Sequence, residues 1–251
     1  MGTELAETTS LDAKASDSAH FRAEVKRGIT SAAPLLAALL AYGMVLGAQA
    51  TQKGLSFVEV PLMTASNYAG GSEFAAIGLW DAPPPILLIA AVTLLINSRH
   101  LIMGAALTPF IRHLSRRKAL VALFFMSDEC WALTYTETQR QAEADRIPAF
   151  SPGYYVGCGA SIYLAWVGAT TLGAAIGPVL GDIDAYGFDM AFPAVFLVLL
   201  AGMWKGPRAA RPWLISLVVA AMTSLIVPGA WYVMAGALSG IAAAAYWAKP
   251  A

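Results

Sequence analysis

The chain has 251 residues, of which 58% are hydrophobic and only 13% are charged, and its 16 Lys and Arg balance its 16 Asp and Glu. Soluble domains carry about 25% charged residues, so this composition argues against a water-soluble domain and favours a membrane protein. The balanced charge removes the electrostatic basis for nucleic-acid binding. Cys130 and Cys158 both lie in apolar segments, which argues against a disulfide framework.

The N-terminal residues are polar, rich in Ala, Ser, Thr and Asp, and lack the apolar core of a secretory signal. We predict a disordered cytoplasmic tail over residues 1–21 and a transmembrane domain over residues 22–251.

The transmembrane domain is predicted to be an all-α, polytopic helix bundle with about seven spans (six to eight), because a span needs about 20 mostly apolar residues. Two segments are interrupted: one contains Pro61 and Gly70-Gly71, and the other contains Ser127-Asp-Glu129. The last two segments are joined by Pro228-Gly229 and are predicted to form a hairpin. In chain order, the candidate segments are 29–50, 57–80, 84–108, 119–136, 153–180, 188–204, 212–228 and 231–247.

Basic residues in short loops predict the orientation, because Lys and Arg favour the cytoplasmic side. If all three basic patches are cytoplasmic, an even number of crossings must separate each patch from the next. Three candidate segments lie between the first and second patches, and three more between the second and third. The count is restored if 57–80 and 119–136, the interrupted segments, do not cross fully. The alternatives are a violation of the charge rule or a miscounted span. The basic patches are Arg22/Lys26/Arg27, Arg112/Arg116/Arg117/Lys118 and Lys205/Arg208/Arg211.

The first polar motif within an apolar segment is Tyr68-Ala-Gly-Gly-Ser-Glu-Phe74. A charged side chain at bilayer depth costs about 2.5–3.5 kcal/mol, so Glu73 needs a partner or a function there. Gly70 and Gly71 permit close backbone approach, and Ser72 and Glu73 are candidates to bind a ligand amine or carry a proton. The alternative is a small-residue packing face with Glu73 at a helix end near water.

The second motif, Asn97-Ser-Arg-His100, is the candidate for carboxylate recognition. Arg99 carries a planar fork of donors that suits a carboxylate, and Asn97 lies beside it. Arg99 is otherwise a structural partner of an intramembrane acid, or a side chain that reaches the cytoplasmic face. His100 titrates near neutral pH and is a candidate proton relay, with a packing role as the alternative.

The third motif, Ser127-Asp-Glu129, places two adjacent acids inside an apolar segment. Like charges side by side favour retention of a proton by one of them, which suits a proton-coupled transporter. The alternative is a helix start, with Ser127 as N-cap and the acids in the first turn. Both readings are compatible, because a helix start is itself an anion-binding feature.

Several catalytic signatures are missing from the sequence. It contains no phosphate-binding Gly-Lys-Ser/Thr loop and no Gly-x-Ser-x-Gly nucleophile motif. One histidine beside adjacent acids is weak support for a metal site. We therefore predict a protein that is not an enzyme, with no cofactor and no metal.

The three motifs, in this order and hydropathy setting, resemble the large subunit of the AzlC-type branched-chain amino-acid exporters (azaleucine-resistance permeases). The resemblance extends from about Val25 to the C-terminus. The family's usual Ala-Gly-Ala-Ser-Gln-Phe is altered here, with Gly71 in place of Ala and Glu73 where Gln is common. Glu titrates and Gln does not, so substrate or ion coupling differs at this position.

The resemblance implies an inner-membrane exporter of leucine, isoleucine, valine and, in some members, methionine. It also implies a small AzlD-type membrane partner and drive by the proton-motive force. For a zwitterionic substrate, Arg99 and the backbone near Asp128 are the candidates for the carboxylate, and Glu73 for the ammonium. Glu73, Glu129 and His100 are the candidates for proton coupling. The alternatives are a non-transporting scaffold subunit and a transporter of another small amino acid or polar solute, whereas an intramembrane enzyme is disfavoured.

Overall fold

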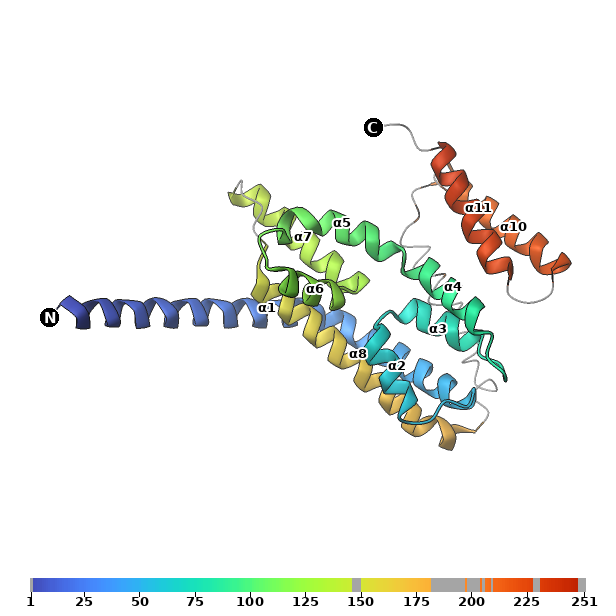
Figure 1. Ribbon diagram of the computed structural model, residues 1–251, viewed down its shortest axis with the longest axis horizontal. Helices are drawn as coiled ribbons and strands as arrows, with labels where there is room; N and C mark the ends of the chain where they lie inside the picture. The colour runs from blue at the N-terminus through green and yellow to red at the C-terminus, as the bar shows by residue number, and fades with distance from the viewer. Residues whose placement is uncertain are drawn as a thin grey trace. The chain divides into compact units, whose positions relative to one another are not determined.

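The computed structural model describes residues 2–145, 150–181, 197, 204, 206–208, 210–227 and 231–247, with side chains from Ser16 onward except at residues 142–145 and 180. All regular structure within these ranges is helical, which confirms the predicted all-α class. The helices, drawn in Figure 1, are α1 (Gly2–Gln52), α2 (Glu59–Asn67), α3 (Gly70–Gly78), α4 (Ile86–Asn97), α5 (Arg99–Ile111), α6 (Arg116–Phe124), α7 (Asp128–Asp145), α8 (Pro152–Leu180), α10 (Arg211–Ile226) and α11 (Trp231–Trp247).

Three stretches of the described chain are long and apolar enough to cross a bilayer. They are Ser16–Gln52 in α1, Ile86–Ile111 across α4 and α5, and Pro152–Val179 in α8. The helix over Arg211–Ile226 is apolar but shorter. Apart from Leu197 and Trp204, the predicted span 188–204 lies outside the described residues, so the predicted total of about seven spans stays a prediction.

The interruptions that the sequence predicts are present. The segment 57–80 forms two short helices, α2 and α3, and the segment 119–136 falls across α6 and α7. The segment 84–108 is also divided, at Ser98, which was not predicted. There the Ser98 hydroxyl donates to the Leu95 carbonyl at 2.6 Å, an alternative to regular helical bonding.

The predicted N-terminal tail continues α1 as a helix that begins at Gly2. Residues 16–22 are exposed, so this part of the helix has little packing against the rest of the described chain. The division into tail and membrane domain at residue 21 stays a prediction.

The chain divides into two compact units, which are described separately. Unit 1 comprises Met1–Met44, Pro61–Tyr68 and His100–Leu172. Unit 2 comprises Val45–Val60, Ala69–Arg99 and Gly173–Ala251.

In unit 1, α1 and α8 pack closely and run in the same direction. A Cβ on Gly153 would lie 2.8 Å from the Phe21 carbonyl oxygen, and one on Gly157 would overlap the Val25 carbonyl oxygen. Further along both helices, a Cβ on Gly43 would lie 2.8 Å from the Ala169 side chain. Residue numbers at the contacts therefore increase in the same direction along both helices, which makes α1 and α8 parallel. Glycines allow this approach, as in other membrane helix pairs, where small residues bring the backbones together.

Helix α2 lies against α8 in unit 1 and runs in the opposite direction (Figure 1). Thr64 pairs with Thr170 through their buried hydroxyls at 2.9 Å, and the Tyr163 hydroxyl donates to the Ala65 carbonyl at 3.0 Å. Tyr68, at the end of α2, also reaches Tyr163. Later residues of α2 thus contact earlier residues of α8, so the two helices are antiparallel.

Unit 2 contains an antiparallel helical hairpin, as predicted for the last two segments. A Cβ on Gly236 of α11 would lie 2.8 Å from the Ala220 side chain of α10, and one on Gly240 would lie 3.0 Å from the Ser216 side chain. Small residues thus line the contact between the two helices. Helix α3 and helix α11 each contact α4 in the same unit.

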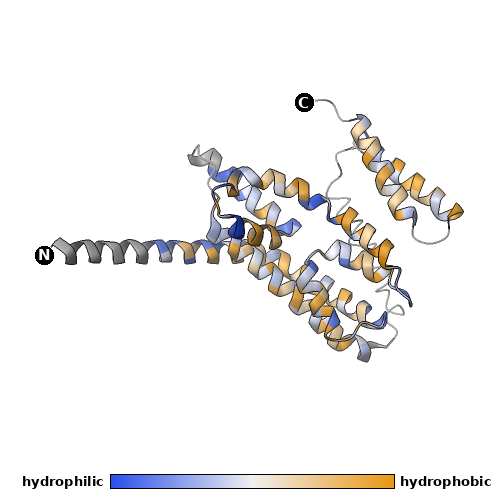
Figure 2. Cartoon of the chain, viewed as in Figure 1, coloured by the Kyte–Doolittle hydropathy of each residue, from blue (hydrophilic) through white to orange (hydrophobic). Residues whose placement is uncertain are grey.

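Large apolar side chains are exposed along the helices, as a lipid-facing surface requires, and Figure 2 shows that hydrophobic residues occur throughout these helices. Examples are Leu87 on α4 (80% exposed), Leu164 on α8 (69%) and Leu225 on α10 (83%). In water such exposure would be unfavourable, because burial of a side chain of this size stabilises the folded state by about 1.5–3 kcal/mol relative to leaving it exposed.

Candidate functional site

Helices α6 and α7 form a hairpin that enters and leaves unit 1 at the same end. Going up α6, the Ala122 carbonyl accepts a hydrogen bond from Tyr155, and the Phe125 ring then lies 5.1 Å from the Tyr163 ring. Going back down α7, Glu137 binds Arg27 near the start of α8. At about 1.5 Å per residue, the nine residues of α6 span about 13 Å, less than half a bilayer core of about 30 Å. A hairpin of this length fits the incomplete crossing predicted for 119–136, which stays a prediction.

The turn of this hairpin is built by Ser127. Its hydroxyl accepts the Cys130 N–H at 3.2 Å, and its carbonyl accepts the Trp131 N–H at 2.9 Å. Ser127 is therefore the N-cap of α7, and Asp128 and Glu129 occupy the first helical turn. This confirms the structural reading of the Ser127-Asp-Glu129 motif, and it also places a helix N-terminus inside unit 1.

The break between α2 and α3 begins at Tyr68, which has a left-handed backbone with φ of 46°. This conformation costs a residue with a side chain about 1–2 kcal/mol. The Tyr68 ring packs edge-on against Tyr163, with ring centroids 4.9 Å apart. Side-chain packing thus holds a backbone conformation that glycine would adopt without cost.

Both helix breaks in unit 1 meet at Tyr163. Tyr163 lies eleven residues after Pro152, the first residue of α8, which is about 16 Å along the helix axis. That is close to the middle of a bilayer core about 30 Å thick. Non-helical backbone at this depth is tolerated where it is buried in protein or lines a polar cavity. Sequence reasoning missed Tyr163, since nothing distinguishes it within an apolar segment.

In unit 2, the first turn of α3 holds Gly70, Gly71, Ser72 and Glu73. The Glu73 Oε1 atom accepts the Ala69 N–H at 3.0 Å, and the Ser72 hydroxyl donates to the Ala69 carbonyl at 2.9 Å. Glu73 is 1% exposed. It therefore lies at a helix start, as the structural alternative expected, but it is buried instead of being near water. A Gln side chain has an oxygen able to accept the same bond.

Asn97 and Arg99 flank the break at Ser98, about half-way along the span Ile86–Ile111. Both are partly buried, and the Arg99 Nε atom is fully buried. Their backbone positions are thus remote from both ends of the span. A partly buried guanidinium at this position has the charge and donor geometry that a carboxylate requires.

The predicted site residues are divided between the two units. Unit 2 contains Asn97, Arg99 and the first turn of α3, whereas unit 1 contains His100, Asp128 and Glu129. Each group lies beside a helix interruption.

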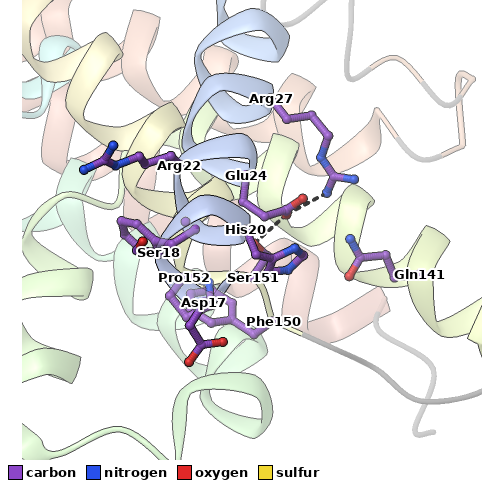
Figure 3. A pocket seen from close by; sticks show the side chains of 12 residues that line it. Asp17, Ser18, His20, Arg22, Glu24, Arg27, Gln141, Phe150, Ser151 and Pro152 are labelled. Atoms are coloured by element: carbon purple, nitrogen blue, oxygen red, sulfur yellow. Dashed lines mark hydrogen bonds and ion pairs between the residues drawn. The ribbon is translucent and has the colours of Figure 1, made fainter. Parts of the chain in front are cut away.

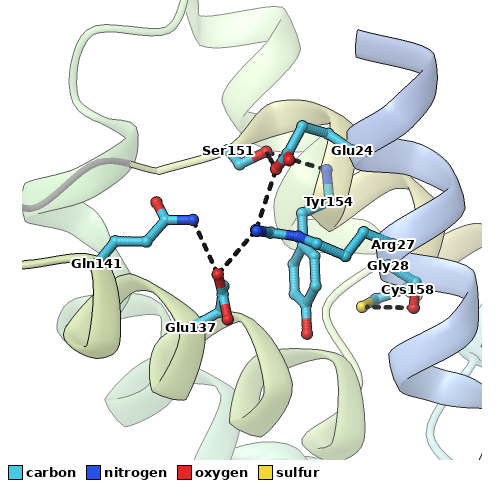
Figure 4. A network of polar contacts seen from close by, with 8 residues as sticks. All are labelled: Glu24, Arg27, Gly28, Glu137, Gln141, Ser151, Tyr154 and Cys158. Carbon is cyan, nitrogen blue, oxygen red and sulfur yellow. Dashed lines mark hydrogen bonds and ion pairs between the residues drawn. The ribbon is translucent and has the colours of Figure 1, made fainter. Parts of the chain in front are cut away.

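A second polar cluster lies where α1, α7 and the start of α8 meet in unit 1 (Figure 4). The Arg27 guanidinium binds Glu24 at 3.1 Å and Glu137 at 2.7 Å, and it lies over the Tyr154 ring. The Ser151 hydroxyl donates to Glu24 at 2.7 Å. The cluster ties the returning arm of the hairpin to α1.

An open pocket of about 970 Å³ adjoins this cluster (Figure 3). It contains cationic side chains, Arg22 and Arg27, and acidic ones, Asp17 and Glu24. Because both signs are present, its lining does not select a ligand by charge.

Replacement of Arg27 is expected to destabilise unit 1. Arg27→Gln leaves the Glu24 and Glu137 carboxylates, which are 14% and 18% exposed, without the cation that separates them. We expect a loss of about 1–2 kcal/mol, less than for a fully buried pair because Arg27 is 45% exposed. Thermal unfolding in detergent measures the effect. Arg140→Gln, an exposed site on α7, is the matched control, and equal unfolding temperatures for the two variants would contradict a structural role for the cluster.

The AzlC protein family model matches residues 34–180, more than half of the chain. The chain belongs to the AzlC family. This AzlC protein is 28% identical to an uncharacterized membrane protein of Haemophilus influenzae over 83% of the chain and 82% of the relative. It is 30% identical to an uncharacterized membrane protein of Archaeoglobus fulgidus, covering 76% and 79% of the two chains.

A third relative of this AzlC protein has a named activity. The branched-chain amino acid transport protein AzlC of Bacillus subtilis is 27% identical over 68% of this chain and 64% of the relative. No solved structure matches the chain. The membrane relatives and the apolar helices make this AzlC protein a multi-pass membrane protein, and its family supports a membrane transporter.

Proposed function

We propose that this AzlC protein is a secondary transporter that exports the branched-chain amino acids leucine, isoleucine and valine, with methionine as a further candidate substrate. The observation that carries the proposal is the similarity to the Bacillus subtilis branched-chain amino acid transport protein. The structure supports it, since interrupted helices at mid-depth are the usual way in which secondary transporters build a substrate site.

The chemistry of the interruptions suits a zwitterion. A substrate carboxylate needs donors, and the candidates are Arg99 and Asn97 in unit 2 and, separately, the first turn of α7 beside Asp128 in unit 1. An ammonium needs acceptors, and the proposed acceptor is Glu73 on the first turn of α3, where Gly70, Gly71 and Ser72 permit close approach. Proton-motive-force drive is assigned to three ionisable side chains of the interrupted segments, Glu73, Glu129 and His100.

The proposed orientation has a cytoplasmic N-terminus in a bacterial inner membrane. The basic residues of α1 lie beside the start of α8, and α6 begins with Arg116 at the same end of unit 1. Gathering the first two basic patches at one end fits the charge rule. Because α1 and α8 are parallel, the chain between them must cross back over the membrane. In this proposal the span over α4 and α5 is that crossing, and the α6–α7 hairpin returns to its own side. The segment α2–α3 must then also return to the side on which it begins.

The proposal includes a small AzlD-type membrane partner. The rival proposals are a non-transporting scaffold subunit, whose buried charges would serve assembly alone, and a transporter of another small amino acid or polar solute. Efflux from preloaded cells for leucine, methionine, alanine and glycine, with and without the partner, separates these proposals.

Glu73→Gln and Arg99→Ala are each expected to reduce leucine efflux from loaded cells about tenfold or more. A hydrogen bond to a charged group contributes about 1.5–3 kcal/mol, and each variant removes one charge from the proposed site. Glu73→Gln keeps the acceptor for the Ala69 N–H, so it tests the charge while preserving the helix start. Exposed Glu59→Gln and Arg117→Ala are the matched controls. Unchanged efflux in both site variants would refute the site assignment.

A further inference from the structure

The inner face of α7 carries polar side chains over most of its described length. In the described part of α7 the buried side chains are Cys130, Thr134 and Thr138, which recur every four residues and therefore lie on one face. Glu137 and Gln141 extend this face, and the Gln141 amide donates to the Glu137 carboxylate at 2.9 Å. Polar and ionisable side chains that face the interior of a membrane protein often mark a path for a substrate or an ion. We refer to Thr134, Glu137, Thr138 and Gln141 together as the polar face of α7.

The polar face connects two features of unit 1. Helix α7 begins at Asp128, directly after the hairpin turn, where the two helix breaks of this unit meet. At the other end, Gln141 lines the open pocket of about 970 Å³ (Figure 3). Gln141 lies thirteen residues after Asp128, which is about 20 Å along the helix axis. The polar face therefore leads from the pocket toward the hairpin turn.

The Arg27 side chain stands where the polar face meets the pocket (Figure 4). Its Nη2 atom lies 2.7 Å from the Glu137 carboxylate of α7 and 3.1 Å from the Glu24 carboxylate of its own helix α1. Arg27 and Glu24 also line the pocket, and Gln141 lies beside Glu137. The Arg27–Glu137 bridge thus links α7 to α1 at the pocket end of the polar face.

The two helix contacts at this level differ in kind. Helices α1 and α8 touch backbone to backbone, since a Cβ on Gly28 would overlap the Tyr154 carbonyl oxygen. Helix α7 instead reaches α1 through the ends of the Glu137 and Arg27 side chains. Close backbone packing resists separation, whereas a side-chain bridge in which the cation is 45% exposed is weak. Of the three helices, α7 is therefore the one able to move at this level.

We propose that the polar face of α7 is the cytoplasmic entrance through which the amino acid reaches the hairpin turn, and that the Arg27–Glu137 bridge is the gate of this entrance. This inference rests on the proposed transport function and orientation. The pocket is then the vestibule, and its mixed charges suit a zwitterion, which carries no net charge. Opening the gate breaks the contact with Glu137 and leaves Arg27 paired with Glu24, so the guanidinium keeps a partner in both states. A polar face also tolerates the water that enters when α7 moves.

A reversible cross-link tests whether the gate must open. Inside-out membrane vesicles expose the cytoplasmic side, so export is measured as uptake of leucine. Arg27→Cys with Glu137→Cys is bridged by a short bifunctional thiosulfonate. We expect uptake to fall about tenfold or more and to return when a reductant cleaves the cross-link, because a closed gate blocks the substrate. The parent protein, treated in the same way, gives the background.

Glu24→Cys with Ser151→Cys is the matched control. The Ser151 hydroxyl donates to Glu24 at 2.7 Å, so this pair links α1 to the start of α8 within the same cluster. The same reagent then joins two helices that are already packed backbone to backbone. Uptake by this variant is expected to be the same before and after cross-linking.

The native cysteines give a second measurement that does not depend on transport. Cys130 and Cys158 are both 0% exposed. A Cβ on Gly159 of α8 would lie 3.5 Å from the Cys130 sulfur, and the Cys158 thiol donates to the Gly28 carbonyl of α1 at 3.3 Å. Glu137 of α7 also acts electrostatically on Cys158. Movement of α7 away from α1 would therefore give a small reagent access to these thiols.

Glu137→Gln removes the charge that Arg27 binds and keeps an oxygen that accepts the Gln141 amide. A small membrane-impermeant thiosulfonate, added to inside-out vesicles, is expected to label the two native thiols about threefold to tenfold faster in this variant than in the wild type. The labelling rate follows the open fraction, and the loss of a partly exposed charge-assisted bond raises that fraction by about this factor. Mass spectrometry identifies the labelled residue. Glu59→Gln, at an exposed site, is the matched control.

The outcomes separate the gate from the transport function. Leucine uptake that persists after positions 27 and 137 are cross-linked overturns the gate and leaves the transport function standing. If the double cysteine variant is inactive before cross-linking, the labelling decides, and equal rates in Glu137→Gln and the wild type overturn the gate. A wild type that takes up none of the branched-chain amino acids overturns the transport function and, with it, the proposed entrance.

Discussion

Gly157→Ala is expected to abolish most of the folded protein, whereas Gly168→Ala on the same helix is expected to be neutral or stabilising. A Cβ on Gly157 would overlap the Val25 carbonyl oxygen and lie 3.1 Å from the Ile29 backbone nitrogen. Backbone atoms in the middle of α1 cannot move aside as a flexible side chain can. Overpacking of this kind costs about 1–3 kcal/mol and rises when the backbone is the obstacle.

Gly168 provides the control because a Cβ there would meet nothing within 4 Å. Its replacement by Ala gains up to about 1 kcal/mol of helix propensity without a steric cost. The monodisperse fraction after detergent extraction, and the unfolding temperature of that fraction, measure both variants. If the two variants behave alike, the close parallel packing of α1 and α8 is wrong.

Single cysteines at the two ends of the α6–α7 hairpin are expected to react from the same side of the membrane. Ser115→Cys lies just before α6 and Gln139→Cys lies in the second half of α7, both at exposed positions, and Ser18→Cys lies in the N-terminal part of α1. All three are expected to react with a membrane-impermeant maleimide only after cells are permeabilised. The result is all-or-none, because a re-entrant hairpin brings the chain back to its own side.

Two further positions complete the labelling experiment. The variants are Lys53→Cys, just after α1, and Asp81→Cys, after α3. If α2–α3 returns to its own side, both are expected to react with the maleimide in intact cells. The parent protein, whose Cys130 and Cys158 are both buried, gives the background. Labelling of positions 115 and 139 from opposite sides would show that α6–α7 crosses the membrane, and the proposed topology would then be wrong.

The helix interruptions were predictable from the sequence where polar or flexible residues stand inside apolar runs. Gly70-Gly71 and Ser127-Asp-Glu129 weaken helix formation locally. The first break lies just before Gly70, at residues 68–69, and the second ends at Ser127, so both adjoin the predicted places. The break at Ser98 was missed, because a single serine within a helical segment has little effect on propensity. The N-cap role of Ser127 was among the alternatives, since serine before acidic residues is typical of a helix start.

The part of the candidate site around Tyr163 was not predictable. Tyr163 lies within an apolar run, and its contacts with Tyr68 and Phe125 join residues about 40 or more positions apart in the sequence. The sequence also assigned no role to Tyr68 beyond its place in the motif. Its left-handed backbone and buried hydroxyl result from packing against helices that lie elsewhere in the chain.

The sequence by itself determined that this protein is helical, resides in a membrane and has interrupted segments, because hydropathy and local propensity act over about 20 residues or fewer. Only the tertiary structure decided that α1 and α8 run parallel, that α6–α7 turns back at mid-depth, and that two breaks meet at one tyrosine. These features depend on which small residues face each other across helices, and no local pattern encodes that pairing.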